Sequence, residues 1–195
     1  MAGQNSERQW WAAVIAALLA CNSFAVAPRL SNISPAGAQR GTTLEMSFSG
    51  ERLQDTEEII CYEPGLRFEK LSWVTNGTIT AKVEISPDCA LGEHHLRLRA
   101  ASGVSELRTF FVAALPVVAE TEPNNERLTA QKAALNTTVV GTIKSEDVDF
   151  FAVELKQGQR FSAEVQGIRL GRANFDPRLL VSDEQGNLVA DTDDT

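Results

Sequence analysis

The sequence contains few of the residues on which common catalytic sites depend. It has three cysteines and only two histidines, His94 and His95, in 195 residues. It has no Gly-x-Ser-x-Gly, His-Glu-x-x-His or phosphate-loop motif. On an alternating strand, His94 shares the face of Leu96 and Leu98 and is expected at the edge of the core, whereas His95 is expected in solvent. We therefore expect no catalytic site within these residues.

Clustered positive charge is also missing. The chain has 18 Lys and Arg residues against 26 Asp and Glu, which gives a net charge of −8. The imbalance lies mainly in the second half, where residues 116–195 contain 14 acids and 8 bases. Because the phosphate backbone of nucleic acid is bound by clustered Lys and Arg, nucleic acid is not expected as a partner.

A long apolar run is lacking as well. The apolar stretch Trp10–Ala20 is shorter than the about 20 residues that a membrane-spanning helix needs. It follows a polar stretch and leads into the small residues of Ser23–Ala27, a pattern typical of a secretory signal peptide. We expect residues 1–25 to be removed, so that the mature form is secreted, periplasmic or at the cell surface, with no membrane span.

A second interpretation of the same region concerns Cys21. The sequence Leu18–Cys21, "LLAC", resembles a lipobox, whose cysteine is lipidated and becomes the mature N-terminus. In either case Cys61 and Cys89 remain as a pair in an oxidising compartment. A disulfide between them would close a loop of about 29 residues and stabilise the fold by roughly 3.5 kcal/mol. The alternative is that Cys61 is a small buried hydrophobic residue.

What the sequence does contain is short runs of alternating polar and apolar residues. Leu44, Met46 and Phe48 alternate with polar residues, as in a half-buried strand. Similar runs, separated by turn sequences, occur at residues 57–62, 65–71, 78–85, 94–100 and 106–113. About seven strands in roughly 90 residues, with no helical pattern of useful length, predict a β-sandwich.

The turn chemistry of this first half resembles a known family. The stretch "PRLSNISPAGAQRGTTLEMSFSGERL" resembles the opening of an IPT/TIG-type immunoglobulin-like domain, and "LGEHHLRLRAASGVSE" resembles its last hairpin. The resemblance implies an immunoglobulin-like sandwich over residues 28–115. It says little about an activity, because such folds serve many functions.

The strand pattern starts again after an acidic linker at residues 116–126. Apolar residues alternate over residues 151–155 and 161–165, with "KQGQ" as a predicted hairpin turn between two antiparallel strands. Residues 183–187, "DEQGN", predict a second hairpin turn. We therefore expect a second sandwich over residues 127–195.

The order of features in this half resembles the bacterial pre-peptidase C-terminal (PPC) domain. These features are "EPNN", then "EDVDFFAVELKQGQRFSAEV", then "FDPRLLVSDEQGNLVADTDD". The resemblance implies a jelly-roll-like module of exported proteins. The module is expected to be incomplete at the C-terminus, because that family continues for another strand or two.

The linker sequence "ETEPNN" is rich in oxygen ligands. In an extended segment Glu120, Glu122 and Asn124 point the same way. Calcium takes six to eight oxygen ligands from carboxylates, amides and carbonyls, so these side chains suit it. The sequence "SEDVDFF" supplies further acids. PPC-like collagen-binding modules hold calcium with a matching linker and turn, and that resemblance implies the ligands Glu120, Glu122, Asn124, Asn125, Glu146, Asp147 and Asp149.

Two other interpretations of the acidic segments stay open. Asn124 or Asn125 can cap a short helix in "ERLTAQKAAL" without binding any metal. The run Asp191–Thr195 is either a solvated loop or another cation site, and it lacks the spacing of an EF-hand loop.

Two functions from different classes fit these observations. The first is a non-catalytic pair of β-sandwich modules that bind an extracellular polymer, a surface or adjacent domains of the same chain, with calcium as the only cofactor considered. The alternative is the export and accessory region of a larger secreted hydrolase, such as a peptidase, whose catalytic domain lies beyond residue 195.

Overall fold

The computed structural model describes residues 26–144, 147–167 and 176–193. The expected signal peptide, Cys21 and Glu146 lie outside the described residues. The described chain is all-β, with no α-helix and one short 3₁₀ turn. No helix in the described ranges is long and apolar enough to cross a membrane.

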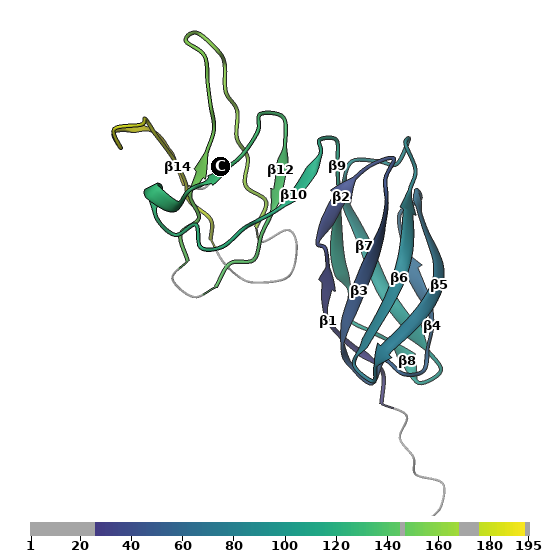
Figure 1. The fold of residues 1–195 in the computed structure, drawn as a ribbon. Coiled ribbons are helices and arrows are strands. Elements are labelled where there is room, and N and C mark those ends of the chain that lie inside the picture. Colours follow the sequence, from purple (N-terminus) through teal and green to yellow (C-terminus); the bar gives the residue numbers. More distant parts are fainter. Residues whose placement is uncertain (1–25, 145–146, 168–175, 194–195) are drawn as a thin grey trace, which may run out of the picture.

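Alternation of polar and apolar residues arranges residues 29–113 in two sheets that pack face to face (Figure 1). The strands of the first sheet are, in spatial order, β1 (Arg29–Ser34), β3 (Thr43–Glu51), β6 (Thr78–Ile85) and β5 (Leu66–Thr75). Those of the second are β2 (Gly37–Gln39), β9 (Arg108–Ala113), β7 (Gly92–Ala100) and β4 (Thr56–Cys61), with β8 (Gly103–Val104) also paired to β7. The predicted strands of this half are confirmed, although β4, β5, β7 and β9 differ by a few residues at their ends.

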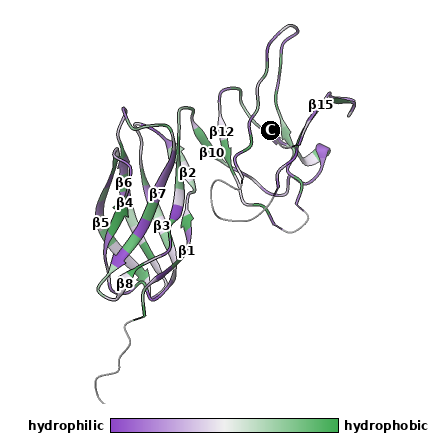
Figure 2. Cartoon of the chain, turned by 180° about the vertical axis from the view of Figure 1, so that it is seen from behind, coloured by the Kyte–Doolittle hydropathy of each residue, from purple (hydrophilic) through white to green (hydrophobic). Residues whose placement is uncertain are grey.

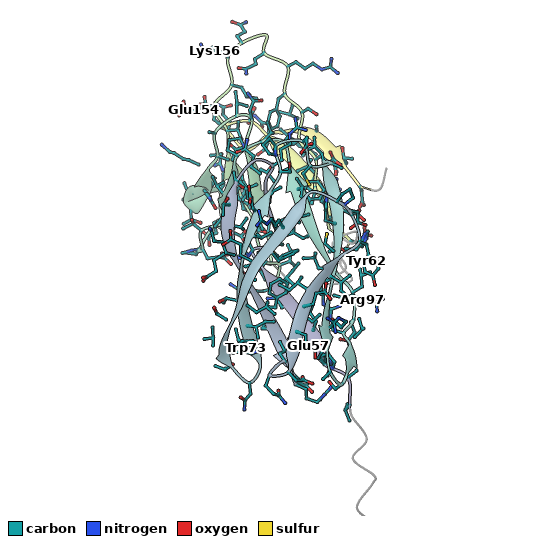
Figure 3. The ribbon with its side chains drawn as sticks, turned by 90° about the vertical axis from the view of Figure 1, so that its right-hand side faces the viewer. Glu57, Tyr62, Trp73, Arg97, Glu154 and Lys156 are labelled. Atoms are coloured by element: carbon teal, nitrogen blue, oxygen red, sulfur yellow. The ribbon has the colours of Figure 1, made fainter. Side chains whose placement is uncertain are left out.

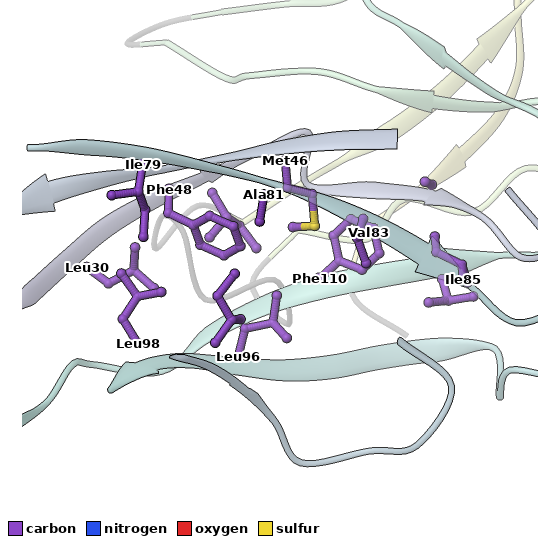
Figure 4. Packing of buried hydrophobic residues seen from close by; sticks show 14 of the residues in the cluster. Leu30, Met46, Phe48, Ile79, Ala81, Val83, Ile85, Leu96, Leu98 and Phe110 are labelled. Carbon is purple, nitrogen blue, oxygen red and sulfur yellow. The ribbon is translucent and has the colours of Figure 1, made fainter. Parts of the chain in front are cut away.

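The register of the strands places one apolar face of each sheet inside. Met46 pairs with Ala81 and Phe48 with Ile79, and all four side chains are buried. Phe110 and its neighbours on β7 and β9 close the core from the opposite sheet (Figure 4). The expected β-sandwich of the first half therefore has a buried apolar core at the predicted positions.

One connection ties the two sheets of the sandwich together. The strands β1 and β2 follow each other closely in the chain but belong to different sheets. Between them, the carbonyl oxygen of Ala36 accepts a hydrogen bond from the Phe111 N–H at 2.9 Å. Gly37 lies against the backbone of Phe111, where a β-carbon would clash with its carbonyl oxygen. The glycine therefore permits the close approach of β2 to β9.

The described residues of the second half form three two-stranded ladders. β10 (Val117–Ala119) pairs parallel with β12 (Thr138–Val140), and β11 (Gln131–Lys132) pairs parallel with β13 (Phe151–Ala152). β14 (Leu179–Ser182) and β15 (Leu188–Thr192) form an antiparallel hairpin around the turn predicted at residues 183–187. The 3₁₀ turn η1 covers Arg127–Thr129.

The first predicted hairpin of this half is only partly correct. A turn lies at "KQGQ", where the Gln159 N–H donates to the Lys156 carbonyl oxygen at 2.9 Å. The strand before it covers only Phe151–Ala152, and its partner is β11 rather than residues 161–165. The physical reason is that the backbone groups of Phe150–Ala152 bond to Asn124, Gln131 and Ala133, which are nearer to the linker.

Apolar burial differs sharply between the two halves. Every buried hydrophobic residue of the described chain lies between Leu30 and Ala113. In the second half Leu180, Leu188 and Val189 are more than half exposed. Figure 2 shows hydrophobic residues, in green, on the strands of the first half and on β10 and β12. The second sandwich therefore stays a prediction, since the described residues of this half form ladders rather than two packed sheets.

We expect replacement of Phe110 by alanine to destabilise the first sandwich by about 3–5 kcal/mol. Phe110 is fully buried, so truncation removes its burial and leaves a cavity. Chemical denaturation followed by circular dichroism measures the change. As a control, Val74→Ala on β5 removes a side chain that is 63% exposed and should cost less than about 1 kcal/mol. Equal effects of the two substitutions would contradict this assignment of the core.

Candidate functional site

The two parallel ladders of the second half hold two segments side by side. The ladder β10–β12 fixes the start of both segments, and the ladder β11–β13 fixes their ends. Residues 120–130 therefore run next to residues 141–144 and 147–150. This arrangement brings together six of the seven expected ligands, here called the acidic cluster: Glu120, Glu122, Asn124, Asn125, Asp147 and Asp149.

Glu120 bridges the two segments. Its backbone N–H donates to the Val140 carbonyl oxygen at 3.0 Å, and its Oε2 accepts from the Thr142 N–H at 3.0 Å. Its Oε1 accepts from Asn124 Nδ2 at 3.1 Å. A β-carbon at Gly141 would clash with this carboxylate. Gly141 therefore leaves room for the Glu120 side chain to fold back over β12.

Asn124 is the one buried polar residue of the second half in the described ranges, with no exposed surface. Its main-chain carbonyl oxygen accepts from the Phe150 N–H at 2.9 Å, and its main-chain N–H donates to Glu122 Oε2 at 3.2 Å. The side-chain Oδ1 is buried and has no hydrogen-bond partner. A buried amide oxygen without a partner costs free energy, so a ligand at this atom would be stabilising.

Asp149 provides a second oxygen of this kind. Its Oδ1 is shielded from solvent and also has no hydrogen-bond partner. Burial, then the negative charge of Glu120 and a side-chain hydrogen bond with Glu120, raise the pKa of Asp149 to about 6, and the charges of Asp147 and Glu122 act in the same direction. Like charges crowded around a shielded carboxylate favour its neutral form. The cluster therefore has more negative charge than its own hydrogen bonds compensate.

The outer part of the cluster is held by Asn125, Asp147 and Lys144. Asn125 Nδ2 donates to Asp147 Oδ1 at 2.6 Å, and the Lys144 N–H donates to Asp147 Oδ2 at 3.0 Å. Lys144 Nζ forms an ion pair with Glu122 Oε1 at 2.9 Å, and this bond raises the pKa of Lys144. Both segments thus contribute to every part of the site.

The cluster consists of carboxylate and amide oxygens, the ligand type that calcium prefers. The described residues contain no three His, Cys, Asp or Glu side chains already arranged as a metal site. Hydrogen bonds to backbone N–H groups, to Asn124 and to Lys144 occupy several of the carboxylate oxygens instead. The two unpartnered oxygens fit an oxygen-seeking cation, which would draw the carboxylates closer.

The alternative expectation, that Asn124 or Asn125 caps a helix, is wrong. The following segment is a 3₁₀ turn whose N-cap position is Glu126, with no capping bond from a side chain. Gln131 and Lys132 then form β11 rather than helix. Pairing beside β13 uses the N–H groups of Gln131 and Ala133, which donate to the carbonyl oxygens of Phe150 and Ala152 instead of closing helical turns.

The cysteines and histidines of the first half form a separate group. Cys89 Sγ lies 3.2 Å from His94 Nε2, and both residues are buried, as expected for His94. His95 is less exposed than expected because it lies against Glu63, with Nδ1 at 2.6 Å from Oε1. Burial raises the pKa of the Cys61 thiol to about 11. Both thiols are free in the structure, and the Cys61–Cys89 disulfide stays a prediction.

One residue of the acidic run Asp191–Thr195 forms an ion pair with an arginine. Asp191 lies on β15 and accepts hydrogen bonds from Arg178, with Nε at 2.9 Å from Oδ1. This ion pair across the β14–β15 hairpin lowers the pKa of Asp191. The negative charge of Asp191 is therefore balanced by Arg178.

No protein-family model matches the sequence, and no curated protein matches it either. The resemblances to IPT/TIG-type and PPC domains therefore depend on the quoted motifs alone. What they imply about function belongs to the proposal below.

Sequence reasoning missed two residues of the site. Gly141 admits the Glu120 carboxylate, and Lys144 binds Glu122. The sequence "GTIKSEDVD" placed both just before the second group of acids, which was the available signal. Their roles depend on the parallel pairing of β10 with β12, for which the sequence pattern contains no marker.

We expect the cation-free site to lose stability as the pH rises from about 4 to above 6. The folded state holds a proton on Asp149 in this range that the unfolded chain has released, so deprotonation favours unfolding. In a chelator, the Thr142 and Phe150 amides, which donate into the site, should show lower hydrogen-exchange protection factors at pH 7.5 than at pH 5.

The variant Asp149→Asn removes the titrating group and should reduce this pH dependence. As a control, Glu154→Gln changes an exposed carboxylate near the following hairpin turn and should leave the dependence as in the wild type (Figure 3). The same pH dependence in Asp149→Asn and in the wild type would show that another group is responsible.

Proposed function

We propose that this chain is part of an exported, non-catalytic protein whose β modules bind an extracellular polymer, a surface or a neighbouring domain. In this proposal calcium bound at the acidic cluster stabilises the second half. Export is supported by the signal-like pattern of the N-terminus, and the modular character by the motifs quoted above. The role of calcium is supported by the donor set of the cluster, carboxylate and amide oxygens from two segments, of which two are buried without a partner.

The observation that carries the proposal is the pair of unpartnered oxygens, Asn124 Oδ1 and Asp149 Oδ1. They come from the two separate segments that the parallel ladders hold together. A cation bound to both would cross-link the segments and compensate the charge on Glu120. The second half has no buried hydrophobic residue in the described ranges, so such a cross-link would supply stability that apolar burial does not.

Among divalent cations, calcium fits this donor set best. Zinc favours histidine and cysteine ligands in a closed tetrahedral arrangement, and the cluster has neither residue. Magnesium demands nearly ideal octahedral geometry at short distances and retains several waters. Calcium accepts irregular sets of carboxylate and amide oxygens, which suits ligands from two loops.

The non-catalytic character is supported by the position of the thiol–imidazole pair. Cys89 is 3% exposed and His94 is 1% exposed, so their reactive atoms lie inside the sandwich core. Burial also raises the pKa of Cys89, which disfavours the nucleophilic thiolate. This pair is better suited to packing than to attack on a substrate.

We expect calcium to bind to the full chain and to stabilise the second half. Stabilisation follows RT ln(1 + [L]/Kd), so about 2.7 kcal/mol is expected at a calcium concentration one hundred times Kd. Isothermal titration calorimetry measures binding, and hydrogen exchange at Phe150 in calcium and in chelator measures stabilisation.

The double variant Glu122→Ala and Asp149→Ala should abolish both effects, whereas Glu154→Gln should retain them. Glu154 is exposed and lies outside the cluster. A wild-type chain that gives no binding heat and equal protection in calcium and chelator would refute the calcium site. Retention of both effects in the double variant would show that calcium binds elsewhere.

A further inference from the structure

A basic side chain already occupies part of the acidic cluster. Lys144 Nζ lies 2.9 Å from Glu122 Oε1, in the only ion pair that the cluster forms within the described residues. The backbone of the same residue is fixed independently, because its N–H donates to Asp147 Oδ2 at 3.0 Å. Lys144 is therefore anchored at the site by its main chain, and its ammonium group is held separately by the ion pair with Glu122.

The side chain of Lys144 is 68% exposed and reaches the cluster from solvent. The unpartnered Oδ1 atoms of Asn124 and Asp149 are shielded from solvent, and Asn124 has no exposed surface. Glu122 contacts both the exposed Lys144 and the buried Asn124, since its Oε1 binds Lys144 Nζ and its Oε2 accepts from the Asn124 main-chain N–H. A cation that enters the cluster and takes the Glu122 carboxylate must therefore displace the ammonium group.

We propose that Lys144 is a tethered cation that competes with calcium for Glu122 and makes the acidic cluster selective for divalent over monovalent ions. This inference rests on the proposed calcium site and adds a residue that sets its affinity and selectivity for cations.

The selectivity follows from charge and tethering. A sodium ion has the same charge as the ammonium group that it would replace, and it loses translational freedom that the tethered lysine has already lost. A calcium ion has twice the charge and gains about twice the Coulomb energy from the same carboxylates. The lysine ammonium is also strongly hydrated on a flexible stem, so its release into solvent is easy.

Calcium binding would change only one of the two attachments of Lys144. The ammonium group leaves Glu122, while the hydrogen bond from the Lys144 N–H to Asp147 stays in place. The loop that contains Lys144 therefore keeps its position beside the linker. The competition lowers calcium affinity without removing the site.

The test compares calcium binding by the wild type, Lys144→Met and Lys156→Met, all as full chains. Methionine keeps an unbranched apolar stem and removes the charge. Lys156 provides a matched control: it is exposed and follows Asp149 by seven residues in an extended segment, about 20 Å further along the chain (Figure 3). Calorimetric titrations are run in choline chloride, whose cation is too large for the site, and in sodium chloride at equal ionic strength.

In choline chloride we expect Lys144→Met to bind calcium about three- to tenfold more tightly than the wild type, and Lys156→Met to match the wild type. Replacement of choline by sodium should weaken calcium binding more in Lys144→Met than in the wild type, because sodium then enters the vacated place. The sodium effect separates competition at the site from a general change in net charge.

Unchanged or weaker calcium binding by Lys144→Met, with binding retained in the wild type, overturns the role of Lys144 and leaves the calcium site standing. An equal gain in Lys156→Met also overturns it, since the effect is then one of net charge. The absence of calcium binding in all three chains overturns both the site and the competition.

Discussion

Backbone pairing between residues 117–132 and residues 138–152 is the constraint on which the second half depends. The parallel ladders β10–β12 and β11–β13 are short, with three and two residue pairs, yet they fix both ends of two neighbouring loops. The bond from the Phe150 N–H to the Asn124 carbonyl oxygen adds a third connection between them. Carboxylates distant in sequence are thereby held close together despite the repulsion between their charges.

The two halves reach stability by different means. The first sandwich buries a continuous apolar core between two sheets, with Phe48 and Phe110 fully enclosed. The described part of the second half buries Asn124 instead, and its polar contacts replace apolar packing. Polar contacts of this kind depend on charge balance, whereas an apolar core does not. The described part of the second half therefore depends more on charge balance than the first sandwich does.

The acidic cluster is balanced in two ways that exclude each other. Without a divalent ion, burial and crowding favour a proton on Asp149, and Lys144 binds Glu122. With calcium, the proposed site would need both carboxylates ionised and Glu122 released from the lysine. In this proposal the proton on Asp149 and the Lys144 ammonium group on Glu122 would each compete with calcium for one carboxylate. The protonation of Asp149, the ion pair of Lys144 and the binding of calcium would therefore depend on one another.

The sequence by itself determined the strands of the first sandwich and the residues that gather at the cluster. The alternation around Met46 and Phe48 specified which face is buried, because the side-chain period of a strand is two. The linker sequence also placed Glu120 and Asn124 in one short stretch, and they are in contact. Such local patterns need no knowledge of distant partners.

Only the tertiary structure decided which strands pair in the second half and how the cluster is neutralised. The segment after Phe150 was expected to fold back on residues 161–165, but it pairs with β11, because a two-residue ladder is chosen by proximity and not by pattern. The roles of Gly141 and Lys144 depend on the same pairing, since both act on residues about twenty positions earlier in the chain. Contacts of that range follow from the path of the backbone in space, which no local pattern of residues specifies.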